Sequence, residues 1–159
     1  MPAKKLSHFD QAGNARMVDV SAKPETRRAA SAHAFVRMRP AVVRALRGNP
    51  KGNPLEVSRI AGIAAAKRTA DLIPMCHPLL LSHIDVAVTV EKQGVRVIST
   101  VATTGPTGVE MEALTAVTVA ALTVYDMTKA LDKAIEIRDV YLLEKTGGRS
   151  GVYRRAGEP

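Results

Sequence analysis

Residues 107–130 read TGVEMEALTAVTVAALTVYDMTKA, and this stretch decides the fold. Its first four residues, from Thr107 to Glu110, fit a capping box, in which a hydroxyl and an acid three positions later satisfy the N–H groups of a helix start. Apolar residues then follow almost without interruption, which predicts a helix up to about Leu131. Because nearly every side of this helix is apolar, we expect it to be buried within the domain or against another subunit.

A strict alternation of apolar and other residues lies just upstream of this helix. Residues 84–90 alternate around Ile and Val, Lys92-Gln93-Gly94 is a turn signal, and residues 95–101 resume the alternation. This pattern predicts a β-hairpin. Downstream of the helix, a last strand is predicted over residues 134–143.

The N-terminal half contains a second well-marked helix. Asn53 is a suitable N-cap, Pro54 a suitable first helical residue, and Glu56 the acid that answers the cap, so we expect a helix over 55–72 that ends before Pro74. The other predicted elements are a strand over 17–20, a strand over 30–38 and a short helix from Pro40 to Gly48.

The order of these elements lacks a regular βαβ alternation. It predicts an α+β fold, with a mostly antiparallel sheet covered by helices on one face. The chain is expected to divide into a flexible N-terminal segment (1–15), a single domain that holds the candidate catalytic residues (16–145), and a mobile, Gly-rich basic tail (146–159).

The composition is typical of a protein of the cytoplasm. The 159 residues are 46% hydrophobic, and two Phe, three Tyr and no Trp leave the core to small aliphatic residues. No apolar run reaches the roughly 18 residues of a membrane span, and the basic N-terminus lacks the apolar stretch of a secretory signal. The single cysteine, Cys76, cannot form an internal disulfide. We therefore expect a cytoplasmic protein without a membrane partner.

A formal net charge of +8 favours an anionic partner, either nucleic acid or a phosphorylated small molecule. Composition does not distinguish the two. The sequence lacks a GxxxxGK[ST] loop and a GxGxxG after a strand, which are the standard phosphate cradles. The four histidines show no metal-ligand spacing, so no metal site is predicted.

Asp126 and Lys129 form the most informative pair of candidate residues. Three positions apart, they share one face of a helix that is otherwise apolar, where ionised groups are costly unless they are paired or functional. A lysine in such surroundings shifts its pKa readily, and an adjacent Asp can relay a proton. A structural salt bridge is the alternative interpretation.

Glu112 is a further candidate on the same helix. Glu110 is explained by the capping box, whereas Glu112 points about 200° away from it and has no such explanation. Glu112 and Asp126 lie on nearly the same face but about 21 Å apart along the axis. If both are functional, the ligand is extended or the site is shared between subunits, and we favour a shared site.

Two lysines and a histidine complete the candidates. Lys51 lies on the Pro- and Gly-containing loop 49–54, either as a presented functional group or as an exposed turn residue. Lys67 can pair with Asp71 or contact an anion. His77 lies in the stiff segment IPMCHPL (73–79), where it is a catalytic group or a structural hydrogen-bonding group.

Four strings carry a more specific pattern: MVDVSAK (17–23), RIAGIAAAKRTADLIPMCHPL (59–79), the stretch quoted first, and KTGGRSG (145–151). Together they closely resemble the cyclic pyranopterin monophosphate synthase family, the molybdenum cofactor biosynthesis protein C family. The resemblance runs from about Met17 to Gly151.

The resemblance implies a ferredoxin-like subunit in a homohexamer, a trimer of dimers with active sites at subunit interfaces. It also implies a lyase that converts 3′,8-cyclo-7,8-dihydroguanosine 5′-triphosphate to cyclic pyranopterin monophosphate and releases pyrophosphate. No cofactor is implied, although Mg²⁺ can accompany the triphosphate, and neither a nucleic acid nor a membrane partner is expected.

The resemblance also suggests roles for individual residues. Asp126, Lys129 and Lys51 match catalytic residues of the family. The residues expected to hold the substrate are Met75, Cys76, His77, Met111 and Glu112, with Lys67, Arg28 and Lys145 as expected triphosphate contacts. The sequence departs from the family pattern at Thr128, where a cysteine is common, and at Ala70, where an aromatic residue can appear.

A basic nucleic-acid-binding module is the alternative function. The net charge suggests it, but stacking aromatic residues on strands are nearly absent, which weakens it.

Overall fold

A five-stranded sheet with the order β2-β3-β1-β4-β5 forms one layer of the fold. The computed structural model describes residues 7–157. The strands, which pair antiparallel throughout this range, are β1 (Thr26–Arg37), β2 (Leu81–Glu91), β3 (Gly94–Gly105), β4 (Glu136–Thr146) and β5 (Tyr153–Arg154).

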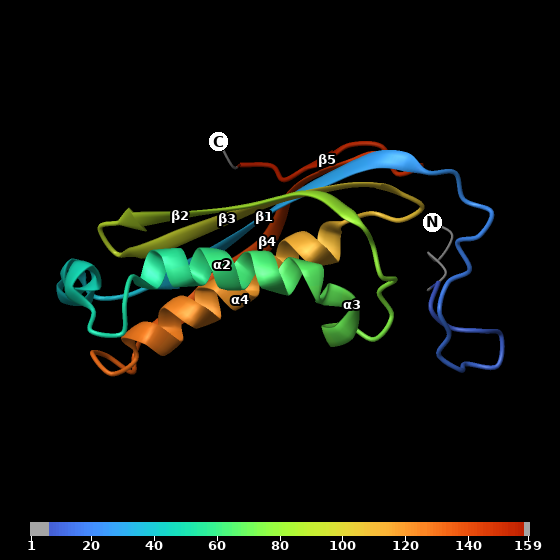
Figure 1. The fold of residues 1–159 in the computed structure, drawn as a ribbon. Coiled ribbons are helices and arrows are strands. Elements are labelled where there is room, and N and C mark those ends of the chain that lie inside the picture. The colour runs from blue at the N-terminus through green and yellow to red at the C-terminus, as the bar shows by residue number, and fades with distance from the viewer. Residues whose placement is uncertain (1–6, 158–159) are drawn as a thin grey trace.

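Two long helices, α2 (Pro54–Lys67) and α4 (Glu110–Thr128), lie on one face of this sheet (Figure 1). The short elements are α1 (Pro40–Ala45), the 3₁₀ helix η1 (Leu46–Gly48) and α3 (Thr69–Leu72). The chain order β1-α2-β2-β3-α4-β4, with β1 and β3 in the centre of the four long strands, is the ferredoxin-like arrangement. The predicted α+β fold with helices on one face is therefore confirmed.

Alternation along β1 builds the core between the sheet and the helices. Ala30, Ala32, Ala34 and Val36 are at most 3% exposed and point to the same side of the strand. They belong to one buried cluster with Ala116 and other small residues of α4. These small side chains let the helices lie close to the sheet.

Gly62 lies where α2 packs against α4. A Cβ at this position would lie 2.9 Å from the carbonyl oxygen of Ala116 and 3.2 Å from Cβ of Ala120. The glycine therefore allows a close helix–helix contact that a larger residue would block. The two helices run in opposite directions, so the end of α2 lies beside the start of α4 (Figure 1).

The locally encoded elements match their predictions. The hairpin is β2 and β3, with Val90 opposite Val95 and a two-residue turn. Asn53 caps α2, because its Oδ1 accepts hydrogen bonds from the N–H groups of Leu55 and Glu56. The predicted helix over 55–72 is divided at Arg68 into α2 and α3.

Three expectations about particular segments are wrong or incomplete. Residues 17–20 do not form a strand of the sheet. Within the single subunit the helix α4 is not buried on all sides, since Leu122 is 54% exposed and Met111 37% exposed, and its burial against another subunit stays a prediction. The strand β5, which pairs with β4, was not predicted.

The predicted terminal segments are only partly within the described range. Residues 1–6 of the N-terminal segment and residues 158–159 of the tail lie outside it. The flexibility of 1–15 and of 146–159 stays a prediction. Among residues 7–157, no helix is both long enough and apolar enough to cross a membrane.

Candidate active site

A cavity of about 450 Å³ opens beside the start of α4. The segment that follows α3 lines it with Met75, Cys76 and His77, and the first turn of α4 lines it with Met111 and Glu112. Five of the residues expected to hold the substrate therefore meet in one place. We call this region the cavity end of α4.

The imidazole of His77 is held by a backbone carbonyl. Its Nε2 lies 2.8 Å from the carbonyl oxygen of Val18. Because a carbonyl only accepts, Nε2 donates, which leaves Nδ1 as an acceptor in the neutral ring. Val18 belongs to the segment wrongly predicted as a strand, and this segment instead forms a wall of the cavity. The hydrogen-bonding role of His77 is confirmed, and its catalytic role stays a prediction.

Glu112 lies inside the protein, with 4% of its surface exposed. Burial raises the pKa of its carboxyl above the ordinary value, and the nearby charge of Glu110 raises it further. Burial also raises the pKa of the Cys76 thiol, with a smaller contribution from Glu112. Cys76 is therefore a protonated thiol and a weak nucleophile at neutral pH. Glu112 has the surroundings of a group that exchanges a proton with a ligand.

A second cavity, of about 420 Å³, adjoins the first. The residues that line both are Lys23, Thr107, Gly108, Glu110 and Ser150. The second cavity also contains three more cationic side chains, which are Arg28, Lys145 and Arg149. Such a concentration of positive charge suits a polyanion such as a triphosphate.

Arg28 and Lys145 are both held in place at this second cavity. The Arg28 guanidinium donates from Nε to the carbonyl of Gly105 (2.9 Å) and from Nη2 to that of Pro106 (3.1 Å). Lys145 Nζ lies 2.8 Å from Glu110 Oε1. The remaining donors of both cations are the ones a ligand would meet.

The predicted capping box at the start of α4 is wrong. The N-cap is Val109, without a side-chain cap hydrogen bond, and Thr107 does not cap the helix. Glu110 is instead paired with Lys145 on β4. The motif was misleading because the partner of Glu110 is distant in the sequence and comes close to it only when the chain is folded.

Lys67 lies at the cavity end as well. It lines a small space of about 120 Å³ together with His77, Glu112 and Ala70. Within residues 7–157, it forms no ion pair with Asp71, so that structural interpretation is wrong. Ala70, at the position where the family can have an aromatic residue, therefore lies in the wall of this space.

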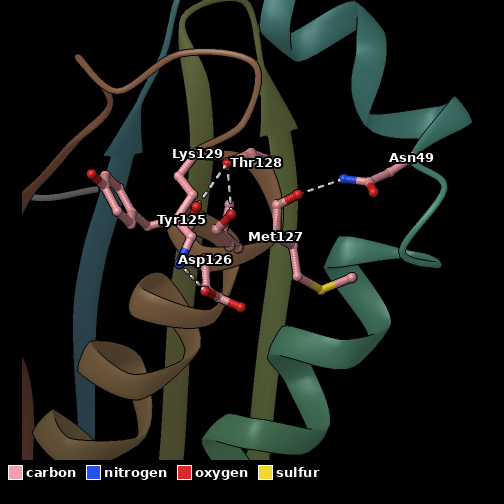
Figure 2. A network of polar contacts seen from close by, with 7 residues as sticks. Asn49, Tyr125, Asp126, Met127, Thr128 and Lys129 are labelled. Carbon is pink, nitrogen blue, oxygen red and sulfur yellow. Dashed lines mark hydrogen bonds and ion pairs between the residues drawn. The ribbon is translucent and has the colours of Figure 1, made fainter.

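Asp126 and Lys129 lie at the opposite end of α4, which we call the ion-pair end. Lys129 Nζ is 2.6 Å from Asp126 Oδ1 (Figure 2). This hydrogen bond and the charge of Lys129 lower the pKa of Asp126, and the charge of Lys51 lowers it further. The same contact raises the pKa of Lys129. Lys51 is therefore close enough to influence Asp126, and its catalytic role stays a prediction.

The surroundings of this ion pair differ from the prediction. The side chains of Lys129 and Asp126 are 50% and 60% exposed, although an apolar environment was expected. Both groups are consequently ionised at neutral pH in the single subunit. Thr128, beside them, is buried and its hydroxyl donates to the carbonyl of Val124 at 2.7 Å, so its polar group is satisfied within the helix.

One subunit therefore brings the candidates together in two groups rather than one. Glu112 and Asp126 are fourteen positions apart on one continuous helix, which corresponds to about 21 Å. Sequence reasoning missed Lys23 and Ser150, which line both cavities. Both belong to strings that carried the resemblance, and that was the available signal. Within the described residues, no group of three or more His, Cys, Asp or Glu is placed to hold a metal ion.

The chain is similar to known proteins along nearly its whole length. Residues 17–148 match the MoaC family. A protein of Parvibaculum lavamentivorans named cyclic pyranopterin monophosphate synthase is 55% identical over 158 residues, which cover 97% of this chain and 99% of that protein. One of Rhodospirillum rubrum with the same name is 57% identical over 155 residues, or 95% and 93% of the two chains.

A third relative is cyclic pyranopterin monophosphate synthase 1 of Mycobacterium tuberculosis, 56% identical over 157 residues that cover 97% of this chain and 92% of that protein. The family match and these relatives extend over nearly the whole chain, including both ends of α4. The chain belongs to the MoaC family.

Proposed function

We propose that this chain is a cyclic pyranopterin monophosphate synthase of molybdenum cofactor biosynthesis. It converts 3′,8-cyclo-7,8-dihydroguanosine 5′-triphosphate to cyclic pyranopterin monophosphate and releases pyrophosphate. The observation that carries the proposal is the 55–57% identity, along almost the full length, to relatives with this name. The two adjoining cavities support it, because one contains hydrogen-bonding groups suited to a ring system and the other is cationic.

The reaction consists of proton transfers followed by a phosphoryl transfer. The purine-derived rings open and rearrange, and a hydroxyl of the substrate then attacks the α-phosphate. A new P–O bond forms between the hydroxyl oxygen and the α-phosphorus. The bond from the α-phosphorus to the bridging oxygen breaks, and pyrophosphate leaves with the electron pair of that bond. Lys23, Arg28 and Lys145 stabilise this leaving group. No electrons are gained or lost, so the lyase as proposed uses no redox cofactor, and Mg²⁺ enters only with the triphosphate.

The proton transfers are assigned to the ion-pair end. Lys51 and Lys129 shuttle protons, and Asp126 orients or deprotonates the substrate. In the single subunit the pKa of Lys129 is raised, which is the wrong direction for a base at neutral pH. Contact with substrate and a second subunit would desolvate the amine and lower its pKa. The chemistry as proposed therefore requires the exposed ion-pair end to be covered.

We accordingly propose that the active site is shared between subunits of a homohexamer, a trimer of dimers. The ion-pair end of one subunit would complete the cavity end of another, because one subunit holds them about 21 Å apart. Exposed apolar side chains on the helices support association: Ile60 is 65% exposed, Leu122 54% and Val57 41%. Burying such residues between subunits is favourable.

The remaining assignments follow from the same reaction. The enzyme works in the cytoplasm on a small nucleotide-derived substrate, and it requires neither nucleic acid nor a membrane. Its basic surface would still bind DNA weakly, with an affinity that falls steeply as salt is added.

The deciding experiment is incubation with the cyclised GTP, while pyrophosphate and the fluorescent oxidised pterin are measured. We expect Asp126→Ala and Lys51→Ala to abolish turnover without changing the molecular mass of the assembly. Lys133→Ala, which alters an exposed lysine near the same end of α4, is the matched control and should retain activity. A wild-type protein that releases no pyrophosphate would refute the function, and active Asp126→Ala and Lys51→Ala variants would refute the assigned residues.

A further inference from the structure

Asn49 connects the loop that carries Lys51 to the last turn of α4. Its Nδ2 donates to the carbonyl oxygen of Met127 at 2.8 Å (Figure 2), and its Oδ1 accepts from the backbone N–H of Lys51 at 2.9 Å. A carbonyl only accepts and a backbone N–H only donates, so the side-chain amide fits in one orientation. The Nδ2 group is therefore bonded to α4, and the Oδ1 atom is bonded to the loop that carries Lys51.

The contact with α4 satisfies a group that the helix itself leaves unpaired. The last four carbonyls of a helix have no intrahelical donor, and Met127 lies in the last turn of α4, which ends at Thr128. Asn49 supplies the donor from a distant segment. The turn that it holds is the one that carries Asp126 and Lys129.

The contact with the loop fixes the backbone of Lys51. The Asn49 side chain accepts from the N–H two residues ahead, which is an Asx-turn. The Asn49 carbonyl accepts from the N–H of Gly52 at 3.1 Å, which closes a four-residue turn with Pro50 in its second position. Lys51 is therefore held relative to Asn49 by two hydrogen-bonded rings, and Asn49 is held to α4.

From this geometry we propose that Asn49 is a positioning residue, which keeps the Lys51 side chain beside the Asp126–Lys129 ion pair. The proposal rests on the proposed function, in which these three groups transfer protons. Asn49 acts through Lys51 and touches no reacting atom. Its role is to join the loop that carries Lys51 to the last turn of α4, so that the three groups keep a constant spacing.

The experiment combines kinetics with NMR titration of the Asp126 carboxyl in the substrate-free enzyme. Asn49→Ala should lower kcat by about 10- to 100-fold while KM stays within about threefold, because misplacing a catalytic group by about 1 Å costs this much. It should also raise the pKa of Asp126, since the Lys51 charge moves away. Asn49→Asp keeps an acceptor for the Lys51 N–H but has no donor for Met127, so it should lose as much kcat as Asn49→Ala.

Two further variants separate positioning from general stability. In the Lys51→Ala background, adding Asn49→Ala should leave the pKa of Asp126 unchanged, because no Lys51 charge remains to move. Asn53→Ala removes the cap of α2 from the same loop without touching α4. It should lower the melting temperature while kcat and the pKa of Asp126 remain those of the wild type.

Three results would overturn the inference. They are an Asp126 pKa that does not change in Asn49→Ala, a pKa change that persists in the Lys51→Ala background, and wild-type kcat in Asn49→Asp. A wild-type enzyme that is inactive on the cyclised nucleotide would instead contradict the proposed function. The Asp126 titration needs no substrate, and in that case it alone decides whether Asn49 positions Lys51.

Discussion

Lys145 on β4 forms an ion pair with Glu110 in the first turn of α4, with 2.8 Å between Nζ and Oε1. The pair lies in the wall of the second cavity, the one that contains Arg28, Lys145 and Arg149. If Lys145 contacts the triphosphate, Lys145→Gln should raise KM about tenfold or more, since a hydrogen bond to a charged group contributes about 1.5–3 kcal/mol. Steady-state pyrophosphate release measures this.

Glu110→Gln is the matched control for Lys145→Gln. It removes the same ion pair but keeps the cation, so KM should not rise, and because the pair is partly exposed the stability should change by less than about 1 kcal/mol. Equal increases in KM for the two variants would mean that substrate binding depends on the ion pair, and not on a direct contact between Lys145 and the triphosphate.

Glu112 makes folding depend on pH, because its pKa in the folded protein is raised above that of an ordinary carboxyl. The folded state then holds the proton more tightly than the unfolded state. The resulting stability is fully present below the unfolded pKa and is lost as pH rises through the folded pKa. Glu112→Gln, which stays neutral, should therefore melt higher than the wild type at pH 8, and this advantage should shrink at pH 4.

Melting temperatures of the wild type and of Glu112→Gln, measured between pH 4 and pH 8, test this prediction. Exposed carboxyls titrate in both and cancel in the difference. A melting-temperature difference that grows as pH falls would contradict the raised pKa of Glu112.

Gly148 leaves room for Arg28. It has φ +72°, and a Cβ there would clash with Nη1 of Arg28. Gly151 has a similar φ of +66° but nothing within 4 Å of a Cβ. Gly148→Ala and Gly151→Ala should each cost roughly 1–2 kcal/mol in backbone strain. Only Gly148→Ala should also raise KM, because it displaces the guanidinium from the cavity; an equal KM in both variants would exclude this role.

Mixing subunits tests the shared site directly. Glu112→Gln and Asp126→Ala inactivate opposite ends of α4, and each variant alone should be inactive. Refolded together in equal amounts, they should recover about a quarter of the wild-type activity, because half of the dimers are mixed and each of these has one intact site. Sites contained within one subunit would show no recovery at any ratio, and sedimentation velocity would confirm that mixed assemblies had formed.

Local patterns were enough to predict the hairpin and both long helices, because their alternation, periodicity and Asn53 cap depend on neighbouring residues. The strand β5 and the wall formed by Val18 depend on contacts with distant segments, which no local pattern reveals. The exposure of Asp126 was missed for a related reason. An apolar helix predicts burial, but it does not say whether the covering surface comes from the same chain.

The charged residues of α4, Lys51, Lys67 and His77 could be selected from local sequence patterns, whereas the resemblance added Met75, Cys76, Met111, Arg28 and Lys145. The fold then showed which of them lie together. Glu112 and Asp126 could be placed far apart from helix geometry alone. That Lys67 lies at the same end as Glu112 follows only from the antiparallel packing of α2 and α4, for which Gly62 leaves room.

The uninterrupted course of α4 has a consequence for how this protein can vary. One residue inserted between Glu112 and Asp126 would move them about 1.5 Å further apart and rotate one relative to the other by about 100°. Both ends of each shared site would then lose alignment at once, however conservative the inserted side chain. Side chains between these two acids can vary where they face neither the core nor a neighbouring subunit, whereas the number of residues between the acids is a functional parameter in its own right.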